Sequence, residues 1–239
     1  MFDEIAREEI ISTIDRMVDD LLHAAGITAP PVDAIDLAQR HLGMVICLDK
    51  QQSQRGRAQR SRGQPAIYLR PEPTEERHQW TVAHEIGEHL KGELLQRLGI
   101  EPGQAKAMTG ESLANLFAYR LLVPGCWFAA DARALDRDLL ALKERYKTSS
   151  HEVVAWRLLD LPEPCIVTIF DNDKISRRRS NGPRATRELL HAEQKCQQLV
   201  NRKGKPKTVR DDGVTVYGWP VHTPEWKREI LRTVIDEMG

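Results

Sequence analysis

The sequence lacks paired cysteines and long apolar runs, and each absence excludes a class of protein. Its four cysteines, Cys47, Cys126, Cys165 and Cys196, stand far apart without a C-x-x-C pair, which disfavours a disulfide framework or a cysteine zinc cluster. No stretch approaches the roughly 20 apolar residues of a membrane span. Acidic residues scattered through the N-terminal segment do not fit a signal peptide. We therefore expect a cytoplasmic protein.

The sequence also lacks a net charge, because 35 Lys and Arg residues balance 35 Asp and Glu residues. This balance gives no global argument for nucleic acid, membranes or acidic substrates, so any charge argument has to be local. Hydrophobic residues make up 41% of the 239 positions. That content is enough to build the core of one large domain, or of a domain with a small appendage.

Apolar periodicity predicts a mostly helical chain with a few short strands. Helices are expected at residues 4–25, 32–43, 74–95, 111–124, 132–146, 149–161, 185–200 and 224–238, and an isolated strand at 214–219. Residues 44–49 and 65–70 resemble a hairpin joined by a long, polar, mobile connection. We expect an α+β fold in which residues 44–49, 65–70 and 165–170 form a small sheet beside the helix that contains HEIGEH.

The C-terminal part is strongly basic. Residues 174–210 contain 12 Lys and Arg residues against Glu188 and Glu193 alone. We therefore expect a domain over residues 1–173 and a basic C-terminal extension over residues 174–239. A charge run of this kind is usually a solvated surface, but it could also contact the phosphates of nucleic acid or an acidic protein partner.

The run HEIGEH, residues 84–89, is the strongest candidate for chemistry. In metallopeptidases of the H-E-x-x-H type, two ligands four residues apart share one helix face, and the glutamate beside the first activates a water molecule. Here Glu88 stands where the second histidine is expected, while His89 lies about 140° round a regular helix from His84. An isolated H-E pair is more often part of a solvated polar face, so further ligands have to be found.

Two alternatives would complete this pair of ligands. Glu88 could bind through oxygen at the geometrically correct position, since carboxylates bind Zn²⁺ and also harder ions such as Mn²⁺. Alternatively, Gly87 could permit a π-bulge that rotates His89 onto the metal face. A third ligand is expected at Glu111, near the start of the helix at 111–124, although an isolated acid there could merely interact with the helix dipole.

With these two segments in this order, the sequence resembles the ImmA/IrrE family of zinc metallopeptidases. The family's first motif, rxxfTxAHElGH, is similar to Arg77 and residues 80–87, and its second, ExxANxFAxxLLxP, is similar to residues 111–124. The matching positions of the second motif are Glu111, Ala114, Asn115, Phe117, Ala118, Leu121, Leu122 and Pro124. The similarity extends to residues 32–43 and 148–161, and so covers roughly residues 20–180.

The resemblance implies a zincin-like metallopeptidase fold and a set of roles for residues. By this resemblance His84 and Glu111 bind zinc, Glu85 is the general base, and Glu88 replaces the family's second histidine. Relatives cut helix-turn-helix repressors and thereby switch on stress-response or mobile-element genes. The chain is thus expected to be a metal-dependent endopeptidase with an H-E-x-x-E motif that acts in transcription regulation.

The replacement by Glu88 leaves a second hypothesis open. A carboxylate adds a negative charge to the metal shell, which weakens Lewis acidity and raises the pKa of a bound water molecule. Hydrolysis could then be slow or lost. The protein would in that case keep the metallopeptidase fold as a binding or regulatory module, which recognises a repressor or toxin or contacts DNA through its basic tail.

Overall fold

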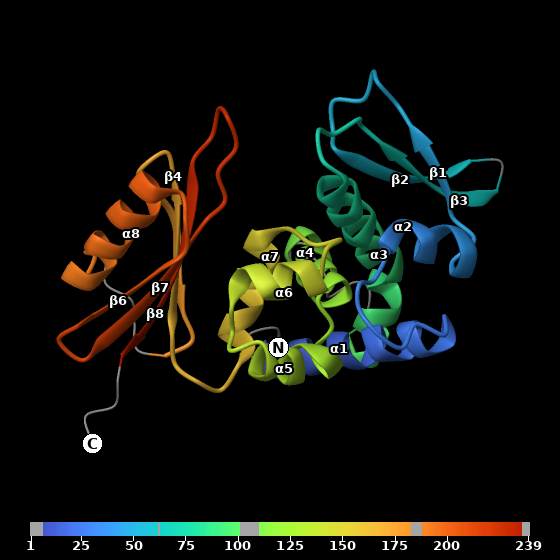
Figure 1. The fold of residues 1–239 in the computed structure, drawn as a ribbon. Coiled ribbons are helices and arrows are strands. Elements are labelled where there is room, and N and C mark those ends of the chain that lie inside the picture. The colour runs from blue at the N-terminus through green and yellow to red at the C-terminus, as the bar shows by residue number, and fades with distance from the viewer. Residues whose placement is uncertain (1–6, 62, 101–109, 183–187, 236–239) are drawn as a thin grey trace. The chain divides into compact units, whose positions relative to one another are not determined.

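The structure, a computed structural model, describes residues 7–61, 63–100, 110–182 and 188–235 (Figure 1). The side chains of Ala58, Arg60, Ser61, Glu111 and Ser112 lie outside this description. The chain divides into two compact units. The first comprises residues 1–134 and 143–150, and the second comprises residues 135–142 and 151–239.

Helices and strands of both units follow the predicted α+β class. The helices are α1 (Arg7–Ala24), α2 (Ala34–Asp36) continued by the π-helix η2 (Leu37–His41), α3 (Glu75–Arg97), α4 (Gly110–Leu122), α5 (Gly125–Ala134), α6 (Leu139–Arg145), α7 (His151–Arg157) with the 3-10 turn η4 (Leu158–Asp160), and α8 (His191–Lys203). The strands are β1 (Val45–Leu48), β2 (Gly56–Ser61), β3 (Gln64–Leu69), β4 (Ile166–Asp171), β5 (Lys174–Ser180), β6 (Lys207–Asp211), β7 (Val214–Pro220) and β8 (Arg228–Ile235).

The long helix α3 is the centre of the first unit. It lies between the first sheet and α4, and α1 packs against both helices (Figure 1). Apolar side chains on one face of α1, among them Ile14 and Val18, are fully buried and follow the predicted helical spacing. Helix α3 begins after Thr74, close to the predicted start, and the acids Glu75 and Glu76 in its first turn are typical of a helix N-terminus.

The first sheet has three strands in the order β1-β3-β2. The predicted hairpin of β1 and β3 is wrong, because these strands are parallel, while β3 pairs antiparallel with β2. Strand β2 lies in the segment that we expected to be a mobile connection. Its sequence GRAQRS has no apolar alternation, so periodicity gave no signal for an edge strand.

The apolar run MVICL, residues 44–48, predicts a buried strand, but this prediction is wrong for β1. Val45 is 41% exposed and Leu48 is 67% exposed. Strand β1 forms the other edge of the small sheet, and an edge strand has a neighbour on one side only. An apolar run therefore marked a strand here without marking a core position.

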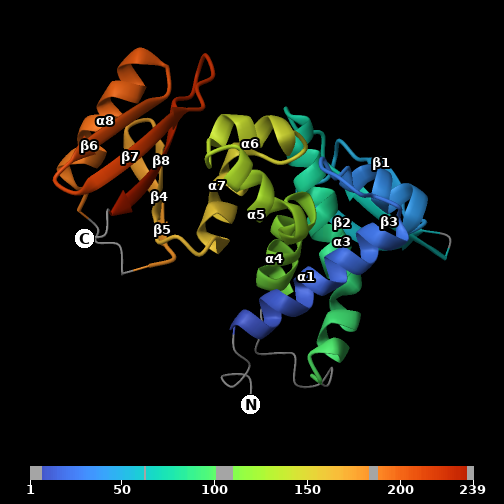
Figure 2. The same ribbon diagram turned by 60° about the horizontal axis from the view of Figure 1, so that its bottom comes forward.

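The second unit is built on a five-stranded sheet in the order β5-β4-β8-β7-β6, with all neighbours antiparallel. Helix α8 lies across one face of this sheet, as Figures 1 and 2 both show. Between them lies a core that includes Phe170, Cys196, Val200, Val216 and Leu231. The apolar stripe of α8 and this face of the sheet therefore bury each other.

Three predictions about the C-terminal half are corrected by this sheet. Residues 165–170 do not join the first sheet, because β4 pairs with β5 and β8. The helix expected at 224–238 is the strand β8, whose β-branched residues suit a central strand buried on both faces. The boundary expected at 173/174 falls in the turn between β4 and β5. Within the basic segment, β5 and β6 belong to the sheet and α8 packs on it.

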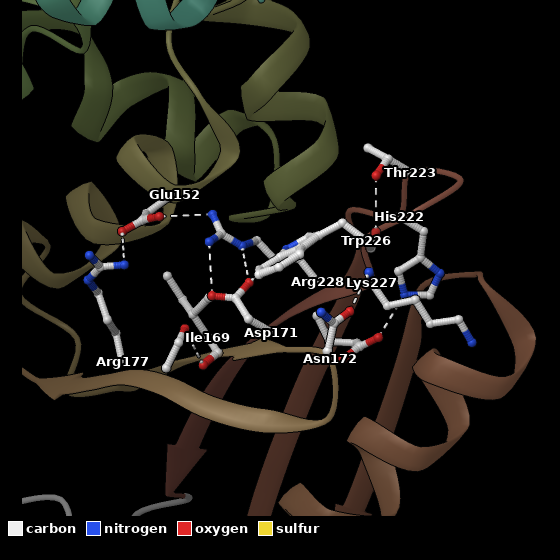
Figure 3. A network of polar contacts seen from close by, with 12 residues as sticks. Glu152, Ile169, Asp171, Asn172, Arg177, His222, Thr223, Trp226, Lys227 and Arg228 are labelled. Carbon is white, nitrogen blue, oxygen red and sulfur yellow. Dashed lines mark hydrogen bonds and ion pairs between the residues drawn. The ribbon is translucent and has the colours of Figure 1, made fainter. Parts of the chain in front are cut away.

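The β4–β5 turn of the second unit carries a network of ion pairs (Figure 3). Arg228 donates from Nε and a terminal nitrogen to the Asp171 carboxylate, at 2.6 and 3.0 Å, and from its other nitrogen to Glu152 at 2.9 Å. The exposed indole of Trp226 donates to Asp171 at 3.1 Å. Burial alone would raise the pKa of Asp171, but the hydrogen bond from Arg228, together with weaker contacts, lowers it overall.

In the described part of the chain, a single helix with the length and apolar content of a membrane span does not occur. The helical segments Leu113–Leu122 and Gly125–Ala134 meet that criterion only when taken together, and the chain bends by 52° between them.

Candidate metal centre

Helices α3 and α4 pack closely because a glycine lies at their contact. A Cβ atom on Gly87 would lie 3.1 Å from both the Ala114 Cα and the Phe117 Cβ, which is closer than ordinary van der Waals contact. A larger residue would push the two backbones apart. Gly87 therefore lets the helix of the HEIGEH run approach the helix of the second motif.

Two side-chain contacts fix how α3 and α4 align. The rings of Trp80 and Tyr119 meet edge to face with their centroids 4.7 Å apart. One turn further along α3, the His84 Nδ1 lies 3.1 Å from the Asn115 Oδ1. Each step of four residues along α3 therefore moves the partner four residues back along α4, as in an antiparallel helix pair.

The contact with Asn115 determines which nitrogen of His84 is available. An amide oxygen only accepts hydrogen bonds, so the His84 Nδ1 carries the proton and donates it, and Nε2 keeps its lone pair. Metal-binding histidines show this arrangement, since their second ring nitrogen usually donates to a neighbouring oxygen. The half-buried imidazole of His84 is thus suited to bind a metal ion through Nε2.

Glu85 lies under the beginning of the edge strand β2. Its side chain is buried, with the residue 8% exposed. A Cβ atom on Gly56 would lie 2.8 Å from the Glu85 Oε1 and 2.4 Å from the Thr81 Cγ2. The first residue of β2 therefore has to be glycine for the carboxylate of Glu85 to keep this position.

A buried carboxylate ties the start of β2 to the start of α3. Glu72, whose side chain is 3% exposed, lies 3.8 Å from the Arg55 guanidinium and accepts hydrogen bonds from Arg70 and Arg77. Burial raises the pKa of Glu72, but the bonds from these arginines lower it overall. The cluster stays charged at neutral pH and holds Arg55, and with it the adjacent Gly56, near the helix.

The structure distinguishes between Glu88 and His89 as the second candidate ligand beside His84. Helix α3 is a regular α-helix from Glu75 to Arg97, so the π-bulge that we predicted as an alternative is absent. His89 is exposed and lies about 140° round the helix from His84. Glu88 is half-buried, four residues after His84 on the same face. The geometry therefore favours Glu88 over His89.

The third predicted ligand is Glu111. Its backbone lies in the first turn of α4, while its side chain lies outside the described part of the chain, so its role stays a prediction. Within the described residues, no group of three or more His, Cys, Asp or Glu side chains is arranged to hold a metal ion. The expected ligand set includes a side chain outside that search.

Sequence reasoning missed two residues of this site. Asn115 was noted only as part of a motif, although its spacing of four residues from Glu111 predicts that both lie on one face of the helix. Gly56 lies in a basic segment that was assigned to a loop. Nothing in the local sequence indicates its contact with Glu85, because that contact depends on how β2 returns over α3.

Comparisons with known proteins identify the family of the chain and a similar fold. Residues 39–158 match a peptidase family described as the IrrE N-terminal-like domain. A Mycobacterium tuberculosis transcriptional regulator of known structure is similar in fold, with a TM-score of 0.64 and 16% identity over 95% of this chain and 80% of that chain. No curated protein sequence matches the chain. The family match covers half of the chain, including α3 and α4, so the predicted family is confirmed and the chain belongs to the IrrE N-terminal-like family of peptidases.

Proposed function

We propose that this protein is a metal-dependent endopeptidase whose metal ion is held by His84, Glu88 and Glu111. The observation that carries the proposal is the hydrogen bond from the His84 Nδ1 to the Asn115 Oδ1, which leaves Nε2 available as a ligand. Family membership supports a metallopeptidase or regulatory role.

The alignment of α3 and α4 supports the remaining ligands. Trp80 meets Tyr119 and His84 meets Asn115, so one further turn brings position 88 opposite position 111. A site of one imidazole and two carboxylates suits Zn²⁺ and also Mn²⁺, because oxygen ligands favour harder ions. The nearby Gly87 keeps the two helices close enough for ligands on both to share one ion.

The metal ion would supply Lewis acidity for the hydrolysis of a peptide bond when bound. Glu85 is the general base in this proposal: it takes a proton from the attacking water molecule and passes it to the leaving amine. Asn115 holds the His84 imidazole in one tautomer. Gly56 and the neighbouring strand cover the Glu85 carboxylate, and this cover limits the access of bulk water to the base.

The proposed substrate is a protein segment in extended conformation. Strand β2 begins over Glu85, and in the described part of the chain its outer edge is not paired with another strand. Such an edge binds an extended peptide by adding it as a further strand. We propose a helix-turn-helix repressor as the substrate and the cytoplasm as the compartment. The described fold contains four free cysteines, and the similar structure is named a transcriptional regulator.

A second candidate function follows from Glu88 itself. Two carboxylate ligands lower the Lewis acidity of a metal ion, so a protein with this ligand set could bind its partner without cutting it. It would then act as a regulatory module that keeps the peptidase fold. This candidate predicts that a repressor is bound and remains intact.

Metal analysis combined with a cleavage assay tests both candidates. The full-length protein is purified, loaded with Zn²⁺ or Mn²⁺, and incubated with a helix-turn-helix repressor from the same genome. The endopeptidase predicts near-stoichiometric metal and a cut repressor. Glu85→Gln keeps the metal and loses cleavage, whereas Glu111→Gln loses the metal. If neither wild type nor Glu88→His binds metal, the metal site and the enzyme are both refuted.

A further inference from the structure

Helix α8 carries exposed cations without a carboxylate partner among the described residues. The basic face of α8 is formed by the exposed residues Lys195, Arg202, Lys203 and Lys205, the last of which follows the helix. Across the described residues, none of these four side chains lies within 4.0 Å of a carboxylate as an ion pair. The positive charge of this face is therefore uncompensated.

Three exposed arginines elsewhere in the chain are paired with carboxylates. Arg40 contacts Asp36 at 2.8 Å, Arg97 contacts Asp20 at 2.7 Å, and Arg145 contacts Asp131 at 3.1 Å, as the salt bridges show. The charge of these three arginines is therefore balanced locally. The four cations of the basic face have no such carboxylate partner among the described residues.

Two acids in or near α8, Glu193 and Asp211, contact other residues. Glu193 is fully buried. Its carboxylate accepts hydrogen bonds from both terminal nitrogens of Arg178, at 2.9 and 3.0 Å. Asp211 contacts His191 at 2.6 Å, at the opposite end of the helix from Lys203. These two carboxylates therefore have other partners. The cations of the basic face remain available to bind an external anion.

The helix dipole explains only part of this arrangement. Cations in the last turn of a helix are stabilised by its dipole, which accounts for Arg202 and Lys203. Lys195 lies in the first half of α8, where the dipole does not favour a cation. Lys195 and Arg202 are seven residues apart, about 10.5 Å along the helix and close to one line on its surface, and both are exposed.

The composition of the basic face distinguishes between two kinds of anionic partner. Interfaces with proteins have an apolar centre, whereas interfaces with nucleic acid are polar and strongly positive. From Gln194 to Lys205 the described structure exposes no large apolar side chain, and Gln194 and Gln198 lie between the cations. The same stretch has no aromatic residue on which an unpaired base could stack.

We propose that the basic face of α8 binds the phosphate backbone of double-stranded nucleic acid. Lys195 and Arg202 contact phosphates from the outer ridge of the helix, and Lys203 and Lys205 add charge at its C-terminal end. Binding of this kind is insensitive to base sequence and weakens steeply with salt. It does not depend on the metal site or on peptide hydrolysis.

Fluorescence anisotropy with labelled duplex DNA and duplex RNA of about 20 base pairs, two helical turns, tests this proposal. Full-length protein is titrated between about 50 and 200 mM salt. The test variant combines Lys195→Gln, Arg202→Gln and Lys203→Gln. The control combines Arg40→Gln, Arg97→Gln and Arg145→Gln, which removes the same charge from paired positions. Circular dichroism confirms that both variants are folded.

We expect wild type and control to bind the duplex, with a slope of log K against log salt that the test variant reduces by up to about 2.7. The preference between DNA and RNA duplexes identifies the source of the phosphates. The proposal is overturned if the test and control variants lose affinity equally, or if wild type does not bind either duplex. Tighter binding to polyglutamate than to the duplex would also overturn it and would identify an acidic protein as the partner.

Discussion

The His84 Nδ1 and the Asn115 Oδ1 lie 3.1 Å apart and join the helices of the two motifs. Replacement of Asn115 by Ala removes this acceptor, so the imidazole loses its fixed tautomer. We expect metal affinity to fall about 10–100-fold, as for other partners of metal-binding histidines. Asn115→Asp keeps an acceptor and should retain affinity. Calorimetric titration with Zn²⁺ measures both values, with the neighbouring Leu116→Ala as control; equal affinities in wild type and Asn115→Ala would refute this role.

The close approach of β2 to α3 predicts an unusual response at Gly56. Gly56→Ala places a methyl group against the Thr81 Cγ2 and the Glu85 Oε1, and we expect a loss of about 1–3 kcal/mol in the free energy of unfolding. Adding Thr81→Ser removes the Cγ2 and should restore part of this loss. Urea unfolding compares wild type, Gly56→Ala and the double variant.

Gly92→Ala is the matched control for that series. A Cβ atom at Gly92 meets nothing within 4 Å, and the residue lies within α3, so alanine should stabilise the protein by about 1 kcal/mol. Opposite signs for Gly56→Ala and Gly92→Ala would support the close contact over Glu85. A stabilising effect at both positions would contradict it.

The ion pair of Asp171 and Arg228 predicts a pH dependence of stability (Figure 3). Because the folded protein holds the pKa of Asp171 below its ordinary value, the pair contributes stability at pH values above the unfolded pKa of about 3.9. This contribution is lost as the pH falls through the lower folded pKa. Asp171→Asn should therefore destabilise the protein at pH 7 and have a smaller effect near pH 3. Urea unfolding at both pH values checks this, and a pH-independent difference would exclude the ionic contribution.

The thiol of Cys126 should react slowly although its residue is exposed. Burial of the thiol and a hydrogen bond with Asp19 raise its pKa to about 12. Asp19→Asn should speed alkylation by iodoacetamide at pH 8, roughly tenfold for each unit by which the pKa falls. Asp20→Asn, which instead disturbs the contact with Arg97, should leave the rate unchanged. Peptide mapping at Cys126 measures the rates.

Local patterns were reliable where one element carries its own signal. Helix α1 follows from its apolar stripe, and α3 follows from the acids of its first turn. The positions of His84 and Glu88 on one face of α3 follow from helical geometry alone. Pairing of strands carries no such local signal, so the partners of β1 and β4 were assigned wrongly.

The sequence by itself determined helices such as α1 and α3, the family and the spacing of the candidate ligands, because these depend on residues close together in the chain. Only the tertiary structure decided that Asn115 holds the imidazole of His84, that Gly56 covers Glu85, and that the last segment is the strand β8. Each of these features is a contact between segments that are far apart in the sequence. Such contacts form only when the whole chain packs, and no local preference indicates them.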